Sequence, residues 1–140
     1  MTSLPSESAS ETHPWRLLLC DDSAVERLAL GHLLRRSGYE VDEADDGESA
    51  ILHLQHRTVD LILLDLHMPG NMDGFKVLNY LRQHRPGLPV ILMSGMQPDD
   101  IQEKMHGLTK HELPPLVIKP FDADQMLNLV EMQLAGEIEN

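Results

Sequence analysis

Short apolar runs alternate along the chain with amphipathic segments, and most of these runs stop at a polar residue or a turn. The apolar runs occupy residues 16–20, 39–44, 59–64, 89–93 and 116–118. The first run is typical of a strand buried on both faces. Segments with helical spacing occupy residues 24–36, 48–55, 74–85, 98–108 and 123–134. Five strands alternating with five helices predict an α/β fold, in which a doubly wound parallel sheet has helices on both faces.

The ends of two predicted helices carry specific signals. Ser23 and Glu26 have the spacing of a capping box, and Gly38 is the expected C-terminal stop of the helix that they open. That helix runs through Val25, Leu28, Ala29, His32, Leu33 and Arg36. Asp122 is predicted to cap the last helix, with Gln125 at the box position.

The chain has 140 residues, the size of one ordinary domain with one hydrophobic core. Residues 1–14 are rich in Ser, Thr, Glu and Pro without periodicity, so they are predicted to be a disordered leader. Residues 15–136 form the predicted domain and residues 137–140 a short C-terminal tail. No output domain is expected after the last helix.

The charge balance disfavours several classes of partner. Lys and Arg number 11 against 23 Asp and Glu, a formal net charge of −12. Nucleic-acid binding and anionic membrane surfaces both require clustered basic residues, so neither is expected. No apolar run approaches the roughly 20 residues of a membrane helix. Residues 1–14 have neither the basic start nor the apolar stretch of a signal peptide. A cytoplasmic location is expected.

The single cysteine, Cys20, excludes an internal disulfide and a cysteine-rich zinc module. It has no basic neighbour that would activate its thiol, so it is expected to be a small buried core residue.

The candidate site residues come from the ends of four of the five predicted strands. Asp21 and Asp22 follow the first strand, and Asp65, Ser94 and Lys119 follow the third, fourth and fifth. Parallel strands joined by right-handed crossovers bring their carboxyl ends to one edge, where open α/β sheets bind ligands. The sequence therefore predicts that these five side chains gather at one site.

The electrostatics of that edge favour a divalent cation. Like charges ~4 Å apart repel by about 4 kcal/mol at an effective dielectric of ~20, so Asp21, Asp22 and Asp65 are unstable as a bare cluster. A divalent ion together with Lys119 balances their charge. The ligands are oxygens, which favours Mg²⁺ or Mn²⁺, and His67 is the one nearby residue that zinc prefers.

The same residues suit phosphoryl transfer. Asp65 is the natural nucleophile and can become an aspartyl phosphate. Lys119 supplies a positive charge to the phosphoryl oxygens, and the hydroxyl of Ser94 can donate a hydrogen bond to one of them. The glycines of a dinucleotide or P-loop site are missing after the first strand, so nucleotide binding of those kinds is not expected.

Taken in order, Asp21-Asp22, Asp65 within LLDLHMPGNMDG, Ser94-Gly95 and Lys119-Pro120-Phe121 resemble the receiver domain of two-component response regulators. The resemblance covers about residues 15–134. It implies a flavodoxin-like fold with the strand order 2-1-3-4-5.

The resemblance also implies roles for individual residues. Asp65 would accept a phosphoryl group from a phosphohistidine on a sensor histidine kinase or a histidine phosphotransfer protein. Asp22, Asp65 and the backbone carbonyl of His67 would ligate Mg²⁺, with Asp21 contacting the ion more indirectly. The Lys119-Pro120 peptide bond is expected to be cis, as at the matching family position.

Three positions bear on switching and on the lifetime of the phosphoryl group. The family usually has Tyr or Phe three residues before the lysine, and Leu116 stands there in this chain. The usual coupling between Ser94 and that aromatic side chain is therefore in question. His67 and Met96, next to the site, are expected to influence how long the phosphoryl group survives.

The favoured reading is a stand-alone receiver that catalyses only its own phosphorylation and dephosphorylation, and is otherwise not an enzyme. Its output would be phosphorylation-dependent binding of another protein. The resemblance implies that this protein binds on the face built from the fourth helix, fifth strand and fifth helix. A homodimer is a further possible partner. One alternative, prompted by Leu116, is a receiver-like binding module that switches without phosphate. The other is a Mg²⁺-dependent phosphohydrolase with Asp65 as nucleophile, which is disfavoured because His67 stands where such enzymes place a second acid.

Overall fold

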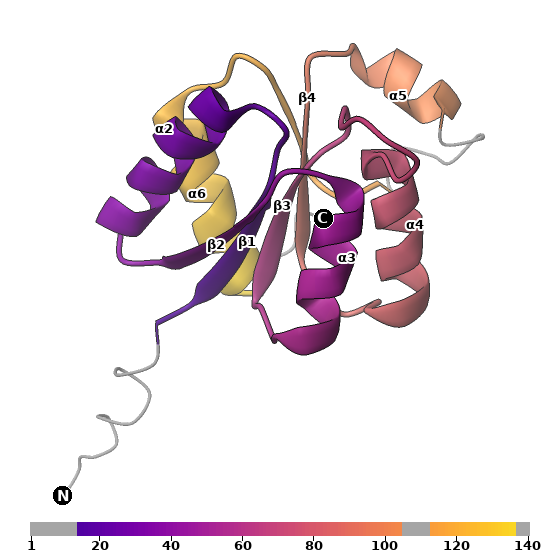
Figure 1. The fold of residues 1–140 in the computed structure, drawn as a ribbon. Helices are drawn as coiled ribbons and strands as arrows, with labels where there is room; N and C mark the ends of the chain where they lie inside the picture. The colour runs from indigo at the N-terminus through magenta and orange to yellow at the C-terminus, as the bar shows by residue number, and fades with distance from the viewer. Residues whose placement is uncertain (1–13, 105–112, 137–140) are drawn as a thin grey trace, which may run out of the picture.

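Five parallel strands pair in the order β2-β1-β3-β4-β5, which confirms the predicted sheet (Figure 1). The computed structural model describes residues 14–104 and 113–136. The strands are β1 (Arg16–Cys20), β2 (Glu40–Ala44), β3 (Leu61–Asp65), β4 (Val90–Ser94) and β5 (Leu116–Ile118). Since β1 and β3 are neighbours while β2 lies outside β1, the chain reverses its direction of winding between these two central strands.

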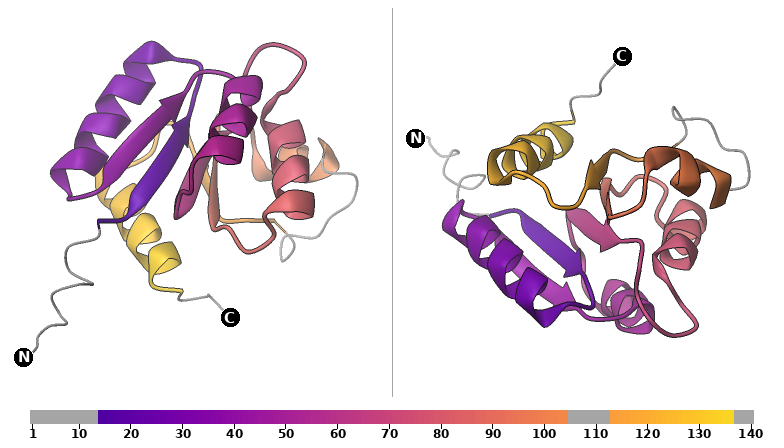
Figure 2. Two further views of the ribbon diagram at one scale, coloured as in Figure 1. Left: turned by 60° about the horizontal axis from the view of Figure 1, so that its bottom comes forward. Right: turned by 90° about the horizontal axis from the view of Figure 1, so that it is seen from above.

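Helices cover both faces of the sheet. They are α2 (Ala24–Arg36), α3 (Gly47–His56), α4 (Gly74–His84), α5 (Pro98–Lys104) and α6 (Ala123–Leu134). Figures 1 and 2 show α2 and α6 on one face and α3, α4 and α5 on the other. The predicted leader up to residue 13, the continuation of the fourth predicted helix to residue 108, and the tail at 137–140 lie outside the described residues.

The sheet separates two apolar clusters. Alternate residues of β3 belong to opposite sides: Ile62 packs into the cluster under α3 and α4, and Leu63 into the cluster under α2 and α6. All five residues of β3 are buried, as the continuous apolar run indicates. Asp65, the polar last residue of β3, therefore lies at the sheet edge at the end of a fully buried strand.

The buried stripe of α2 differs from the positions singled out in the sequence. Val25 and Leu28 are exposed, at 77% and 72%, whereas Leu30, Gly31 and Leu34 are buried. The sequence of α2 carries two apolar stripes, and the one with Leu30 and Leu34 packs against the sheet. Val25 and Leu28 are left on the surface, whereas Leu33 is half-buried and packs against the cluster under α2 and α6.

The caps of the helices are partly as predicted. The hydroxyl of Ser23 accepts a hydrogen bond from the backbone N–H of Glu26 at 3.2 Å, and Gly38 has a φ of +99° just beyond α2. The second hydrogen bond of the capping box, from the N–H of Ser23 to the carboxylate of Glu26, is absent. The N–H of Ser23 donates to Asp21 Oδ1 at 2.9 Å instead. Asp122 occupies the N-cap of α6 but accepts no capping hydrogen bond with its side chain, so the capping box predicted there is wrong.

Candidate functional site

Four strand ends converge on one edge of the sheet. Asp21 and Asp22 follow β1, Asp65 and Ser94 are the last residues of β3 and β4, and Lys119 follows β5. These four strands are consecutive neighbours in the sheet, so their ends lie side by side. The structure brings together the five side chains that the sequence places at this edge.

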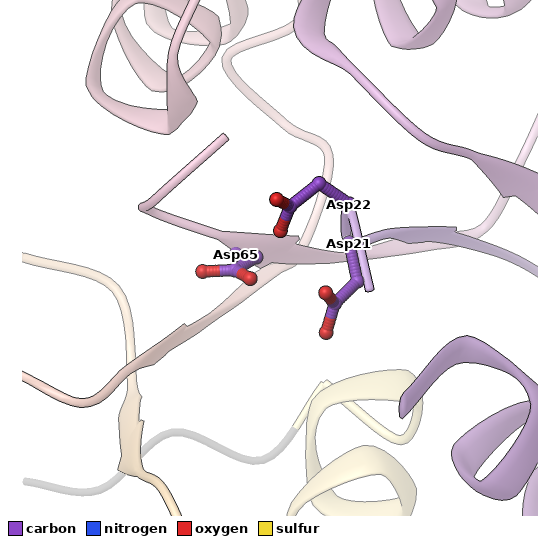
Figure 3. Close-up of side chains that lie close together, drawn as sticks. All are labelled: Asp21, Asp22 and Asp65. Carbon is purple, nitrogen blue, oxygen red and sulfur yellow. The ribbon is translucent and has the colours of Figure 1, made fainter. Parts of the chain in front are cut away.

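Three carboxylates form a cluster at the ends of β1 and β3 (Figure 3). One carboxylate oxygen from each of Asp21, Asp22 and Asp65 lies within 4.8 Å of the others. Asp21 and Asp65 are buried, while Asp22 is exposed. An all-oxygen donor set of this kind, with one side open to solvent, fits Mg²⁺, which is commonly held by one or two carboxylates and several waters.

The ammonium group of Lys119 joins the buried part of this cluster. Its Nζ lies 2.9 Å from Asp65 Oδ2, 3.2 Å from Asp21 Oδ2 and 2.5 Å from Glu26 Oε1. Burial opposes the charged form of the lysine. The hydrogen bonds to Glu26 and Asp65, together with the charges of Asp65 and Asp21, outweigh burial and raise the pKa of Lys119 well above its usual value.

The other side of Asp65 is bounded by His67 and Ser94. The backbone N–H of His67 donates to Asp65 Oδ1 at 2.9 Å, and its ring Nε2 lies 3.0 Å from the hydroxyl oxygen of Ser94. That hydroxyl is fully buried and also accepts from the N–H of Met96 at 2.9 Å. The imidazole ring meets the ring of Phe75 edge to face, with centroids 6.5 Å apart. Ser94 is thus linked through His67 to the first turn of α4.

The loop after β3 brings the start of α4 close to Asp65. A Cβ atom on Gly74 would lie 2.3 Å from the carbonyl oxygen of Asp65 and 2.4 Å from Leu66 Cα. No side chain fits in this space, so glycine is required for α4 to begin where it does.

Two further expectations concern the strand next to Lys119. The Lys119-Pro120 peptide bond is cis, as the resemblance implies. Leu116, at the first position of β5, is half-buried and packs against the cluster under α3 and α4. An aliphatic side chain therefore fills the position at which the family usually has an aromatic ring.

Sequence reasoning missed Glu26 as a site residue and treated it only as part of a capping box. Its place in the first turn of the helix that follows Asp21 and Asp22 is the signal that could have identified it. Cys20 is buried as expected, and burial, reinforced by the charges of Asp21 and Asp65, raises the pKa of its thiol.

A cavity of about 620 Å³ opens beside the site, between α2 and the segment that joins β5 to α6. Asp21, Glu26 and Lys119 line it on the side of the carboxylates, and Leu33 and Phe121 provide apolar lining. We call it the α2 cavity. It extends from Asp21 and Lys119 along α2 to Leu33.

Comparison with known proteins identifies the class to which this fold and site belong. Residues 17–131 match the sequence profile of the response regulator receiver domain, and the chain belongs to that family. Receiver domains act in two-component signalling, where sensor histidine kinases phosphorylate them, and they bind Mg²⁺ at an acidic pocket. They are generally phosphoacceptors rather than enzymes.

Two relatives show how widely the domain is used. The probable transcriptional regulatory protein TcrX of Mycobacterium tuberculosis is 32% identical over 118 residues, which are 84% of this chain and 49% of that protein. The CAI-1 autoinducer sensor kinase/phosphatase CqsS of Vibrio cholerae is 30% identical over 120 residues, 84% of this chain and 17% of that protein. The chain spans about half or less of the length of these relatives.

Solved structures share the whole fold. The chemotaxis protein CheY4 of Vibrio cholerae is 27% identical with a TM-score of 0.73, over 85% of this chain and 98% of that one. The signal receiver domain of an HD domain-containing protein from Pseudomonas fluorescens is 28% identical with a TM-score of 0.77, over 89% and 97%. Among the described residues, no helix has the length and apolar character needed to cross a membrane.

Proposed function

We propose that Asp65 of this receiver accepts a phosphoryl group from a phosphohistidine on a sensor histidine kinase or a histidine phosphotransfer protein. The observation that supports this most strongly is the placement of two phosphate-binding groups on either side of one buried carboxylate. Lys119 contacts Asp65 Oδ2 at 2.9 Å, and the hydroxyl of Ser94 ends the neighbouring strand. These groups can stabilise the charge on a transferring phosphoryl group.

The proposed transfer forms one bond and breaks one. A carboxylate oxygen of Asp65 attacks phosphorus and forms the acyl phosphate, while the phosphorus–nitrogen bond to the donor imidazole breaks and its electron pair returns to the ring. Lys119 and Ser94 hold the phosphoryl oxygens, and the backbone N–H of His67 keeps the carboxylate oriented through Asp65 Oδ1. His67 and Met96 border the phosphoryl group and influence its lifetime.

Mg²⁺ is the proposed cofactor, with Mn²⁺ as a substitute. Asp22, Asp65 and the backbone carbonyl of His67 would hold the ion, and Asp21 would contact it more indirectly. When bound, the ion supplies positive charge that offsets the carboxylates and the incoming phosphoryl oxygens. The carboxylate oxygens within 4.8 Å of one another support this assignment.

The phosphodonor is proposed to dock on the exposed stripe of α2. Val25 and Leu28 are the two most exposed large apolar side chains of that helix, and the helix begins directly after Asp21 and Asp22 at the phosphoacceptor edge. A donor that delivers a phosphoryl group to Asp65 approaches this same edge. An apolar helix face on the donor would cover both side chains.

The proposed output is phosphorylation-dependent binding of another protein. We assign it to the face built from α5, β5 and α6, where a homodimer is a second candidate partner. Helix α5 is connected directly to the site, since it follows β4 and Ser94.

The test of phosphorylation uses acetyl phosphate as donor with Mg²⁺. We expect a mass increase of one phosphoryl group in the unmodified chain and none in Asp65→Asn. Asp45→Asn is the matched control, because Asp45 is an exposed carboxylate that follows β2 at the same edge, and we expect it to be phosphorylated normally. A mass increase that survives Asp65→Asn would refute the assignment.

Two further measurements, partner binding and turnover of a phosphomonoester, separate the two alternatives. A binding module that switches without phosphate would show no mass increase, yet would still bind its partner. A phosphohydrolase would turn over a generic phosphomonoester many times with Mg²⁺, whereas a phosphoacceptor would not.

A further inference from the structure

Glu26 gives the phosphoacceptor site a fourth carboxylate. It projects from the first turn of α2, and its Oε1 makes the shortest of the three contacts of Lys119, at 2.5 Å. Its side chain is 49% exposed, whereas those of Asp21 and Asp65 are 2% and 4% exposed. Glu26 is thus the one solvated partner among the three carboxylates that hold the lysine.

The helix cap leaves Glu26 available for this contact. In a capping box its carboxylate would return to the N–H of Ser23. That N–H donates to Asp21 Oδ1 at 2.9 Å, so the cap is complete without the side chain of Glu26. The carboxylate extends instead to Lys119.

The ammonium group of Lys119 has three N–H donors, and three carboxylates occupy them. Phosphorylation removes the charge of the Asp65 carboxyl, so a first phosphoryl oxygen can take over the contact of Asp65 with the lysine. A second phosphoryl oxygen can reach the lysine only if Asp21 or Glu26 leaves. Releasing Asp21 would leave a buried carboxylate without a partner. This costs far more free energy than releasing a carboxylate that water can solvate. Glu26 is the partner whose release costs least.

We propose that Glu26 is a positioning residue that holds Lys119 before phosphorylation and is displaced from it by the phosphoryl group. The inference rests on the proposed phosphorylation of Asp65. It predicts that phosphorylation frees a carboxylate at the α2 cavity, which Glu26 lines together with Lys119. The phosphorylated state is thereby marked by a new free negative charge next to α2.

The test measures the affinity for beryllofluoride in the presence of Mg²⁺, by titration followed with amide chemical shifts. Glu26→Gln removes the charge of the competing contact, and this is expected to tighten binding about two- to fivefold, the range of an exposed ion pair. Glu26→Asp keeps the charge but retracts the carboxylate by one methylene, and is expected to behave like Glu26→Gln. Asp45→Asn removes a charge from the same edge without a contact to Lys119, and is expected to bind like the unmodified chain.

A second measurement uses the unmodified chain alone. The side-chain carboxyl carbon of Glu26 and the ammonium signal of Lys119 are expected to shift together when beryllofluoride saturates the site. An unchanged affinity in Glu26→Gln, a normal affinity in Glu26→Asp, or an unmoved Glu26 signal would each overturn the inference. Failure of the unmodified chain to bind beryllofluoride at all would instead overturn the proposed phosphorylation.

Discussion

The ring of His67 lies 3.0 Å from the hydroxyl oxygen of Ser94, measured from Nε2. Ser94 is fully buried, and its hydroxyl oxygen accepts a hydrogen bond from the N–H of Met96. The hydroxyl that is proposed to bind a phosphoryl oxygen therefore already has two partners. We expect the hydroxyl to donate its single proton to Nε2 of His67, so that engaging the phosphoryl group requires it to exchange His67 for the new acceptor.

Replacing His67 with leucine is expected to tighten beryllofluoride binding by about two- to tenfold. A net hydrogen bond of roughly 0.5–1.5 kcal/mol no longer has to be broken when Ser94 turns toward the phosphoryl mimic. The affinity is measured by titration with Mg²⁺ present. A looser complex would mean that the imidazole itself holds the phosphoryl group.

A double variant, His67→Leu combined with Ser94→Ala, tests whether His67 affects beryllofluoride binding through Ser94. In a Ser94→Ala background the hydrogen bond is already missing, so His67→Leu is expected to change the affinity no further. An undiminished effect in that background would show that His67 acts independently of Ser94.

Replacing Gly74 with alanine is expected to destabilise the fold and to disturb the site. The new Cβ would lie 2.3 Å from the carbonyl oxygen of Asp65, so the start of α4 or the end of β3 has to move. Overpacking of this kind costs about 1–3 kcal/mol. Denaturant unfolding measures the loss of stability, and the phosphorylation rate with acetyl phosphate reports the displacement of Asp65.

Gly87→Ala is the matched control for this substitution. Gly87 has no heavy atom within 4 Å of the position of a Cβ, in the turn between α4 and β4. We expect its stability and phosphorylation rate to remain close to those of the unmodified chain. Equal losses in both variants would argue against the close approach at Gly74.

The fold could be predicted from the sequence because strand and helix segments differ in period and because each strand stops at a polar residue. The buried stripe of α2 could not be predicted in this way. Val25 and Leu28 are as apolar as Leu30 and Leu34, and only the packing of α2 on the sheet selects the second pair. Periodicity alone does not say which of two apolar stripes faces inward.

The site was predictable to the extent that it depends on strand ends, because parallel pairing fixes where those ends lie. Contacts between side chains from different elements were not. The contact of Glu26 with Lys119 joins α2 to the end of β5, and that of His67 with Ser94 joins the end of β3 to β4. Such contacts depend on side-chain conformations that residue spacing leaves open.

Removing the N-cap side chain is expected to reduce stability by different amounts at Asp46 and at Asp122. Asp46 Oδ1 accepts a hydrogen bond from the N–H of Ser49 at 2.8 Å at the start of α3, whereas Asp122 makes no such bond at the start of α6. Asp46→Ala is therefore expected to lower the free energy of unfolding by about 1 kcal/mol, and Asp122→Ala by clearly less. Denaturant unfolding at pH 7 makes the comparison. Equal losses would contradict the capping geometry.

The loss at Asp46 is also expected to depend on pH. The backbone and side-chain hydrogen bonds from Ser49 lower the pKa of Asp46 below its ordinary value. A carboxylate with a lowered pKa adds stability above the ordinary aspartate pKa of about 4, and this stability disappears as the pH falls through the lowered value. The difference between the unmodified chain and Asp46→Ala should therefore shrink from pH 7 to pH 3. A difference that stays constant would show that the charge of the cap contributes nothing.

The exposed stripe of α2 predicts a difference between protein and small-molecule donors. Replacing Val25 and Leu28 with serine removes two apolar side chains that a docked donor would bury, each worth about 1.5–3 kcal/mol when fully covered. Phosphorylation by a histidine phosphotransfer domain that acts on the unmodified chain is expected to slow by tenfold or more. The rate with acetyl phosphate should not change, because this small donor needs no protein surface.

Leu52→Ser is the matched control, since Leu52 is 57% exposed on α3, across the sheet from α2. Equal slowing with both donors would indicate damage to the site, and normal rates with both would place the donor on another surface.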